Sequence, residues 1–182
     1  MSARALLIPR ASPAWLAPAA IALGCAALLA RTISYESMGA TALVGVLGLV
    51  MPVAARAAKT GASRWVAVTL SGFAAFWAGR ALGEGVGVRL TTLGVVAIIL
   101  AAVAEEAFFR RFVYGWAERF GAGTAIAVST VLFALIHLPM YGGGVMWIDL
   151  AAGALLGWQR WATGSWTSPA VTHVVANLLQ MG

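Results

Sequence analysis

The amino-acid sequence predicts an all-α protein, folded as a polytopic bundle of transmembrane helices. Hydrophobic residues make up 62% of the 182 residues and charged residues only 10%, whereas a soluble domain of this size has about 25% charged residues. The mean hydropathy is +0.90. Apolar runs recur along the whole chain with very short connections between them. We therefore expect one integral membrane domain over residues 1–182.

Seven apolar runs predict about seven membrane-spanning helices, with six or eight as the alternatives. Several runs are near the ~20 residues that a helix needs to cross the hydrocarbon core, and flanking residues can complete the shorter ones. Basic residues stand between the runs, as they do beside membrane spans. The runs cover residues 14–30, 38–55, 65–79, 90–104, 121–138, 146–158 and 167–181.

The first three runs carry no functional motif. Run 14–30 follows Arg4 and Arg10, so its start has the charge pattern of a signal peptide. It ends in Leu-Leu-Ala, however, which is a poor cleavage site, and we expect a retained membrane anchor. Three basic residues separate the second run from the third and indicate a loop there.

The fourth run, 90–104, leads directly into Glu105 and Glu106. We expect its helix to continue beyond Phe112, for about 25 residues, which places Glu105 near the middle of the membrane. Long cationic side chains near a helix end reach toward the membrane interface, and we expect this of two arginines in the continuation, Arg110 and Arg111.

The last three runs carry both histidines of the chain and a pair of small residues. His137 ends the fifth run and His173 lies in the seventh. In the sixth, Gly153 and Gly157 have the Gly-xxx-Gly spacing that lets helix backbones approach closely. Asp149 is expected to cap the start of this helix, the alternative being that it reaches the site.

The basic residues are distributed unevenly between alternate loops, which predicts the orientation of the chain. Three of them fall on one side, namely Arg31, Arg80 and Arg89. Nine fall on the other side, namely Arg4, Arg10, Arg56, Lys59, Arg64, Arg110, Arg111, Arg119 and Arg160. Because positive residues favour the cytoplasmic side, we expect a cytoplasmic N-terminus.

The net charge of +6 does not indicate a nucleic-acid-binding protein. Such proteins gather Lys and Arg on one soluble face, whereas here they stand singly or in small groups between apolar runs. We therefore expect no nucleic acid among the partners. The single cysteine, Cys25, lies in an apolar run and is expected to be a small buried hydrophobic residue.

Two glutamates that directly follow an apolar run and both histidines of the chain predict a functional site. Three acidic residues elsewhere, Glu36, Glu84 and Glu118, stand among basic neighbours in predicted loops. The residues of the predicted site stand instead within or directly after apolar runs, namely Glu105, Glu106, His137 and His173. Burying such groups in a membrane is costly, so they usually line a cavity or a pathway.

These residue types are suited to hydrolysis. A carboxylate and an imidazole around one water can remove its proton while it attacks a carbonyl carbon. A second imidazole and a side-chain amide can donate hydrogen bonds to the oxyanion that develops. His173 and Asn177 are four residues apart, hence on one helix face, and Glu106 and Arg110 share this spacing. We do not expect Ser129, two turns before His137, to act as a nucleophile.

The order of these residues resembles a known family, the CPBP or Abi family of CAAX-processing and bacteriocin-processing intramembrane endopeptidases. The resemblance covers about residues 90–179. It rests on three short motifs on separate predicted helices, Glu105-Glu106-xxx-Arg110, Phe133-xxx-His137 and His173-xxx-Asn177.

The resemblance implies a glutamate-dependent protease. Glu105 would be the general base, with His137 positioning the same water. His173 and Asn177 would stabilise the oxyanion. Three residues would support the site or engage substrate, namely Glu106, Arg110 and Phe133, the last as packing or as a wall of the cavity.

A zinc site is the alternative chemistry. Glu105, His137 and His173 are suitable ligands, and a catalytic zinc needs three ligands and one open position. The chain has no His-Glu-x-x-His sequence, which would place two ligands on one helix face. We therefore expect no cofactor and metal-free glutamate chemistry.

The expected function is hydrolysis of a peptide bond in a membrane-associated protein or peptide. One alternative is a non-enzymatic immunity or scaffold protein of the same family, and another is a proton-coupled transporter, in which Glu and His form a relay. No internal repeat supports the transporter. High Ala, Gly, Val and Arg usage is typical of GC-rich bacteria, so a bacterial inner membrane is the expected location.

Overall fold

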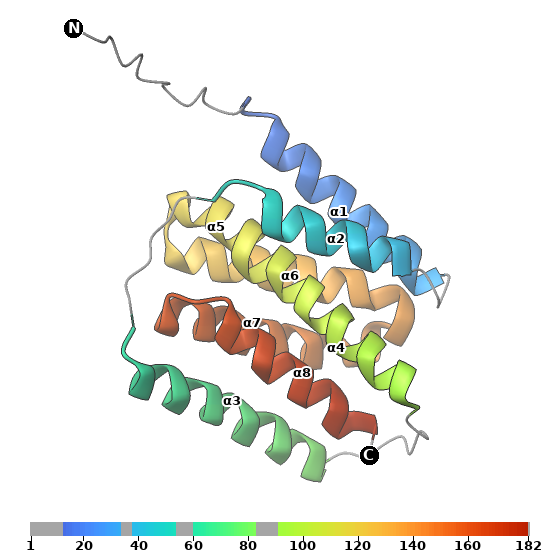
Figure 1. Ribbon diagram of the computed structural model, residues 1–182, viewed down its shortest axis with the longest axis vertical. Helices are drawn as coiled ribbons and strands as arrows, with labels where there is room; N and C mark the ends of the chain where they lie inside the picture. The colour runs from blue at the N-terminus through green and yellow to red at the C-terminus, as the bar shows by residue number, and fades with distance from the viewer. Residues whose placement is uncertain (1–12, 34–37, 54–59, 83–90, 182) are drawn as a thin grey trace, which may run out of the picture.

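The computed structural model describes residues 13–33, 38–53, 60–82 and 91–181, which form seven helical rods (Figure 1). The longest rod is a continuous helix made of α4 (Thr92–Glu106), a π-helical segment (Ala107–Val113), α5 (Tyr114–Ala117) and a final 3₁₀ turn (Glu118–Phe120). The other six rods are α1 (Leu16–Ile33), α2 (Met38–Val50), α3 (Ala62–Leu82), α6 (Ala122–Tyr141), α7 (Met146–Thr163) and α8 (Thr167–Met181). The all-helical prediction is therefore confirmed for the described residues.

The composite helix confirms the expectation of a long fourth helix. It spans Thr92–Phe120, which is 29 residues, and Glu105 lies close to its midpoint. Thr91 caps its start, since the Thr91 hydroxyl accepts a hydrogen bond from the Gly94 amide at 3.1 Å. The carboxylates of the predicted site therefore lie far from both ends of the helix.

Two helices are long and apolar enough to cross a membrane by length and composition, Thr92–Phe120 and Ala122–Tyr141. Leu16–Arg31 and Met38–Val50 are apolar but shorter. The number of spans, about seven from the sequence, stays a prediction.

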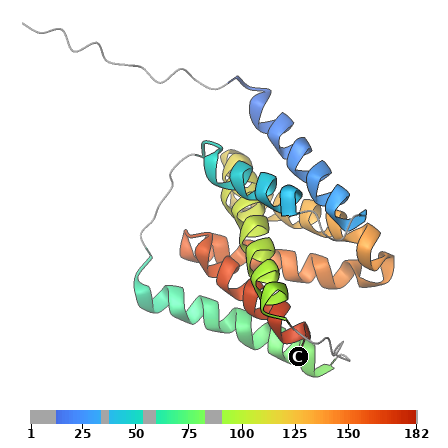
Figure 2. The ribbon, with the colours of Figure 1, turned by 45° about the vertical axis from the view of Figure 1, so that its right-hand side comes forward.

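The composite helix runs through the middle of the bundle in both views (Figures 1 and 2). On one side α2 packs against α4 and the π-helical segment, and α1 packs against α2 and α6. On the other side α8 lies against α4, and α3 packs against α7 and α8. Residues from both sides can therefore reach the centre of the composite helix.

The Gly-xxx-Gly pair permits close packing of α6 and α7. A Cβ atom added at Gly153 would lie 3.2 Å from the Thr130 Cα, and one at Gly157 would lie 3.2 Å from Ile126 Cγ2. Each position is tighter than ordinary van der Waals contact. The close approach brings α7 against the helix that carries Phe133 and His137.

Polar side chains fix α8 against α3 and α7. Thr69 of α3 and Ser168 of α8 share a buried hydrogen bond of 2.8 Å. Gln159 of α7, fully buried, donates to the Val68 carbonyl at 2.9 Å and to the Thr172 hydroxyl at 3.0 Å. Because Thr172 precedes His173, these bonds hold the part of α8 that carries His173.

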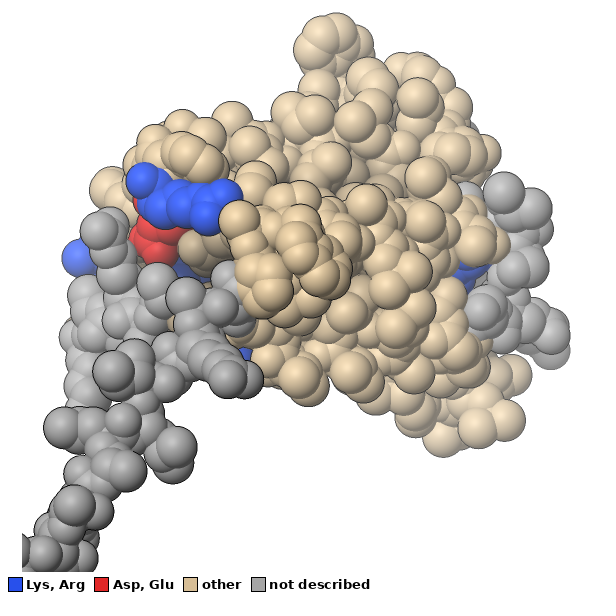
Figure 3. Space-filling model, turned by 90° about the horizontal axis from the view of Figure 1, so that it is seen from above, with Lys and Arg blue, Asp and Glu red and all other residues tan. Residues whose placement is uncertain are grey.

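The described surface is largely apolar and uncharged. Leu93 is 82% exposed and Trp147 is 76% exposed. Seen from above, charged atoms gather near the edges of the molecule, and the area between them is uncharged (Figure 3). Such a surface is suited to contact with lipid.

Several expectations about element ends are wrong. Asp149 does not cap α7: it lies inside the first turn, where Val145 is the N-cap residue and makes no side-chain capping bond. Arg160 does not lie in a loop, because α7 continues to Thr163. Arg64 and Arg80, also expected in loops, lie inside α3. Several residues of the charge and loop analysis lie outside the described residues, namely Arg4, Arg10, Glu36, Arg56, Lys59, Glu84 and Arg89.

Candidate active site

Glu105 and His137 face each other across a short gap. Glu105 Oε2 lies 4.0 Å from His137 Nε2, and the two side chains are 5% and 12% exposed. The His137 Nδ1–H group donates to the Phe133 carbonyl at 2.8 Å, which leaves Nε2 as an acceptor. An oxygen atom between Oε2 and Nε2 can lie within about 2.8 Å of both. The pair therefore offers two proton acceptors to one water.

Two aromatic rings fix the plane of the His137 imidazole. The Phe133 ring centroid lies 4.6 Å from that of His137. One turn after His137, the Tyr141 ring stacks on the imidazole with the two centroids 5.9 Å apart. These residues are spaced by four along α6, so one helix face presents all three rings.

Glu106 occupies a separate and drier position. Its Oε1 accepts a hydrogen bond from His173 Nδ1 at 2.8 Å, and its Oε2 lies 3.3 Å from Arg110 Nε. The Glu106 and Arg110 side chains are fully buried. Because Glu106 holds the Nδ1–H of His173, the other nitrogen of that ring can carry a proton and donate to a substrate oxygen.

Arg110 does not extend to the membrane interface, contrary to the expectation from the sequence. Its guanidinium lies over the Phe133 ring at 4.7 Å and donates to the Gly153 carbonyl at 3.1 Å. Its own carbonyl accepts from Arg160 Nε at 3.0 Å. Charge pairing with Glu106 and a carbonyl acceptor together offset the cost of burying the guanidinium. Arg111 is half-buried and donates to the carbonyls of Gly48 in α2 and of Met51, which directly follows α2.

Phe133 lies between the charged groups of the site. It is 4% exposed and packs edge-on against Phe109 and His173, at 5.7 Å in both cases. Its ring thus contacts the imidazoles of both His137 and His173.

Asn177 lies on α8 and Asp149 on α7. Asn177 is half-buried, one turn after His173. Asp149 is close enough to His137 for electrostatic interaction, and its Oδ2 is buried with no hydrogen-bond partner among the described residues. The Ser129 hydroxyl donates to the Ile126 carbonyl of its own helix at 3.1 Å.

Arg31 is a residue of the site that no sequence pattern indicates. The sequence predicts a loop at Arg31, yet it lies in the last turn of α1 and its Nη2 donates to Glu105 Oε1 in an ion pair. An arginine directly after an apolar run is as typical of a loop as of a helix end that faces a buried site. In addition, 74 residues separate Arg31 from Glu105. No local pattern connects the two.

The arrangement divides the predicted zinc ligands between two centres. Glu105 faces His137, whereas His173 bonds Glu106. Across the described segments, no three His, Cys, Asp or Glu side chains come together as a metal-binding group.

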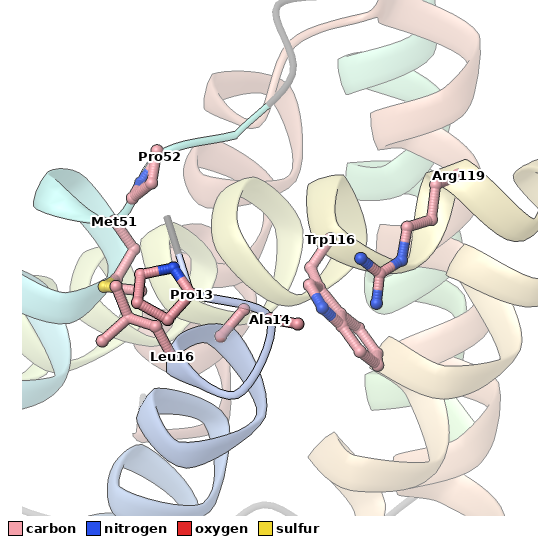
Figure 4. Close-up of a pocket in the computed structure, with 8 residues that line it drawn as sticks. Pro13, Ala14, Leu16, Met51, Pro52, Trp116 and Arg119 are labelled. Atoms are coloured by element: carbon pink, nitrogen blue, oxygen red, sulfur yellow. The ribbon is translucent and has the colours of Figure 1, made fainter. Parts of the chain in front are cut away.

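A separate hollow of about 150 Å³ lies at the other end of α1 (Figure 4). Leu16 borders it, about 22 Å along the helix from Arg31. Trp116 and Arg119 form its polar wall, and the Arg119 guanidinium lies over the Trp116 ring at 4.6 Å. The described residues that line the hollow include no carboxylate or imidazole and none of the residues of the centre described above.

Chemically, the centre combines a carboxylate and an imidazole acceptor with a second, charge-supported imidazole. The first pair can activate a water, and the second can donate to a developing negative charge. Burial makes each of these electrostatic interactions stronger than it would be in water.

A family of known proteins matches the part of the chain that carries these motifs. The family described as type II CAAX prenyl endopeptidase Rce1-like matches residues 87–179, just over half of the chain. Searches among curated proteins and among solved structures find no match. The matched segment contains every residue of the predicted site, whereas Arg31 lies outside it.

Proposed function

Since the chain belongs to the Rce1-like family of type II CAAX prenyl endopeptidases, a membrane-embedded protease family, we propose that it hydrolyses a peptide bond in a membrane-associated protein or peptide. The observation that carries this proposal is the pair of acceptors, Glu105 Oε2 and His137 Nε2, held 4.0 Å apart in a largely buried site.

In the first step, Glu105 removes a proton from the water that His137 helps to hold, and the water oxygen attacks the scissile carbonyl carbon. The C=O electron pair moves onto the oxygen. His173, supported by Glu106, and Asn177 donate hydrogen bonds to this oxyanion. The protonated Glu105 then gives its proton to the leaving nitrogen as the C–N bond breaks.

No metal enters this scheme. The support for glutamate chemistry is that Glu105 and His137 already provide both proton acceptors for one water. Metal analysis of purified, active protein tests this point. Zinc well below one equivalent per chain is the expected result, and a stoichiometric zinc that is needed for activity would overturn it.

The substrate is proposed to be a membrane-associated chain near a hydrophobic or lipidated C-terminus, in keeping with the activity that gives the family its description. The proposed location is a bacterial inner membrane, with the N-terminus in the cytoplasm. The apolar surface supports direct contact with lipid, and nucleic acid is not among the proposed partners.

The test compares cells that express the wild type, Glu105→Gln or Glu118→Gln at matched levels. Glu118 lies on the same composite helix and does not belong to the site, so it is the matched control. Newly formed peptide termini are identified by mass spectrometry. Termini present with wild type and Glu118→Gln but absent with Glu105→Gln are expected.

Identical termini in all three strains would contradict the proposed protease activity. If the Glu105→Gln variant also complemented a deletion strain as well as the wild type does, the non-enzymatic immunity or scaffold role would replace the proposed protease activity.

A further inference from the structure

Arg31 is the one described residue outside the family-matched segment that forms an ion pair with a carboxylate of the candidate site. We propose that Arg31 is a positioning residue for Glu105, and that α1 and α2 therefore complete the active site of this chain. The inference rests on the proposed role of Glu105 as the base.

The two oxygens of Glu105 have different partners. Arg31 Nη2 donates to Oε1, while Oε2 faces His137 Nε2. The last torsion of a glutamate side chain has a broad energy minimum, so packing alone does not fix the plane of the carboxylate. A cation held on Oε1 does fix it, and it keeps Oε2 directed toward the water position.

Arg31 is itself anchored to the bundle. Its Nη1 donates to the Thr41 hydroxyl of α2 at 3.3 Å, and Thr41 is 7% exposed. Three residues before Arg31, Leu28 is fully buried in the core against which α1 packs. A chain of contacts thus runs from α2 through Arg31 to Glu105.

Each carboxylate of the site has its own arginine. Glu106 pairs with Arg110, inside the matched segment, and Glu105 pairs with Arg31, outside it. Removal of Arg31 would leave a nearly buried carboxylate without a cationic partner, which is strongly unfavourable. The pairing therefore keeps Glu105 in the ionised form that a base needs.

The kinetic test compares Arg31→Gln, Arg31→Lys and the control Arg64→Gln, with Arg64 exposed on α3. A misplaced catalytic group costs about 100-fold in rate, so Arg31→Gln is expected to lower kcat by about this factor with little change in KM. Arg31→Lys restores part of the loss, and Arg64→Gln behaves as the wild type. A wild-type kcat for Arg31→Gln would overturn the proposal.

Chemical rescue separates positioning from a general role of α1 in stability. The Arg31 side chain is 16% exposed, so a small cation can reach its place. Millimolar methylguanidinium is expected to raise the kcat of Arg31→Ala and to leave that of Glu105→Gln unchanged. If Arg31→Ala melts at the same temperature as the wild type but methylguanidinium does not raise its kcat, the proposal is contradicted.

A thermal double-mutant cycle tests the pair without any substrate. Arg31→Gln alone leaves Glu105 unpaired, so the double variant Arg31→Gln/Glu105→Gln is expected to melt at a higher temperature than Arg31→Gln. Additive losses would overturn the proposal. Because this readout needs no activity, failure of the proposed protease function and failure of the Arg31 contact give different results.

Discussion

At the scale of single residues, Glu105 and Glu106 are adjacent in the chain but have different surroundings. Successive residues on a helix point about 100° apart, so the two carboxylates cannot share one set of partners. Glu105 faces His137 and Arg31, which are both partly exposed, whereas Glu106 lies against the buried side chains of Arg110 and His173. The first environment is suited to water and substrate, and the second to holding His173 and Arg110.

This difference predicts losses of stability of different size for the two matched substitutions. Glu106→Gln is expected to reduce the free energy of unfolding by about 3–5 kcal/mol, because it leaves Arg110 buried without its counter-charge. Glu105→Gln is expected to cost less, because Arg31 can move its charge toward solvent. Thermal unfolding of both variants in one detergent measures the difference. Equal melting temperatures for the two variants would contradict the division of roles.

At the scale of the elements, the contact between α2 and the π-helical segment depends on one glycine. A Cβ atom at Gly48 would lie 2.4 Å from the Ala107 carbonyl carbon and 2.5 Å from the Phe108 amide nitrogen. Both are backbone atoms, which cannot turn aside as a flexible side chain can. The Gly48 carbonyl also accepts a hydrogen bond from Arg111 at 2.5 Å. The absence of a side chain thus sets how closely α2 approaches the residues that follow Glu106.

We therefore expect Gly48→Ala to be strongly destabilising, by more than the 1–3 kcal/mol typical of overpacking, since backbone must move. Gly79→Ala in α3 is the matched control, because a Cβ atom there meets nothing within 4 Å. The control gains about 0.5–1 kcal/mol from better helix propensity. Thermal unfolding distinguishes them, and a Gly48→Ala variant as stable as the control would show that α2 does not pack as described.

At the scale of the whole molecule, the open question is which end of each helix lies on which side of a membrane. Helix α6 is long and apolar enough to span, and its ends are marked by exposed residues, Phe120 just before it and Gly144 just after it. The uneven distribution of basic residues predicts that the Phe120 end is cytoplasmic.

Single cysteines at these two positions test the span and its direction together. In a Cys25→Ala background, Gly144→Cys is expected to react with a membrane-impermeant maleimide in intact cells, and Phe120→Cys only after the membrane is opened. Labelling of both positions from one side would exclude α6 as a span. The reverse pattern would keep the span and invert the predicted orientation.

The sequence by itself determined the helical class, the approximate bounds of the seven helices and, apart from Arg31, the side chains that contact Glu105 and Glu106. The reason is that both kinds of signal are local: apolar runs define helices, and spacings of four residues place Glu106 with Arg110 and Phe133 with His137 on single helix faces. The roles of these residues in catalysis, and the number of membrane spans, stay predictions.

Only the tertiary structure decided which helices meet and therefore which charges pair. The inward position of Arg110, the buried Gln159 and the contact of Arg31 with Glu105 all depend on segments distant in the chain. A charged residue at the end of an apolar run has the same local sequence whether it faces water or a buried carboxylate. The difference lies in the desolvation cost and in the partner that offsets it, and both are properties of the packed bundle.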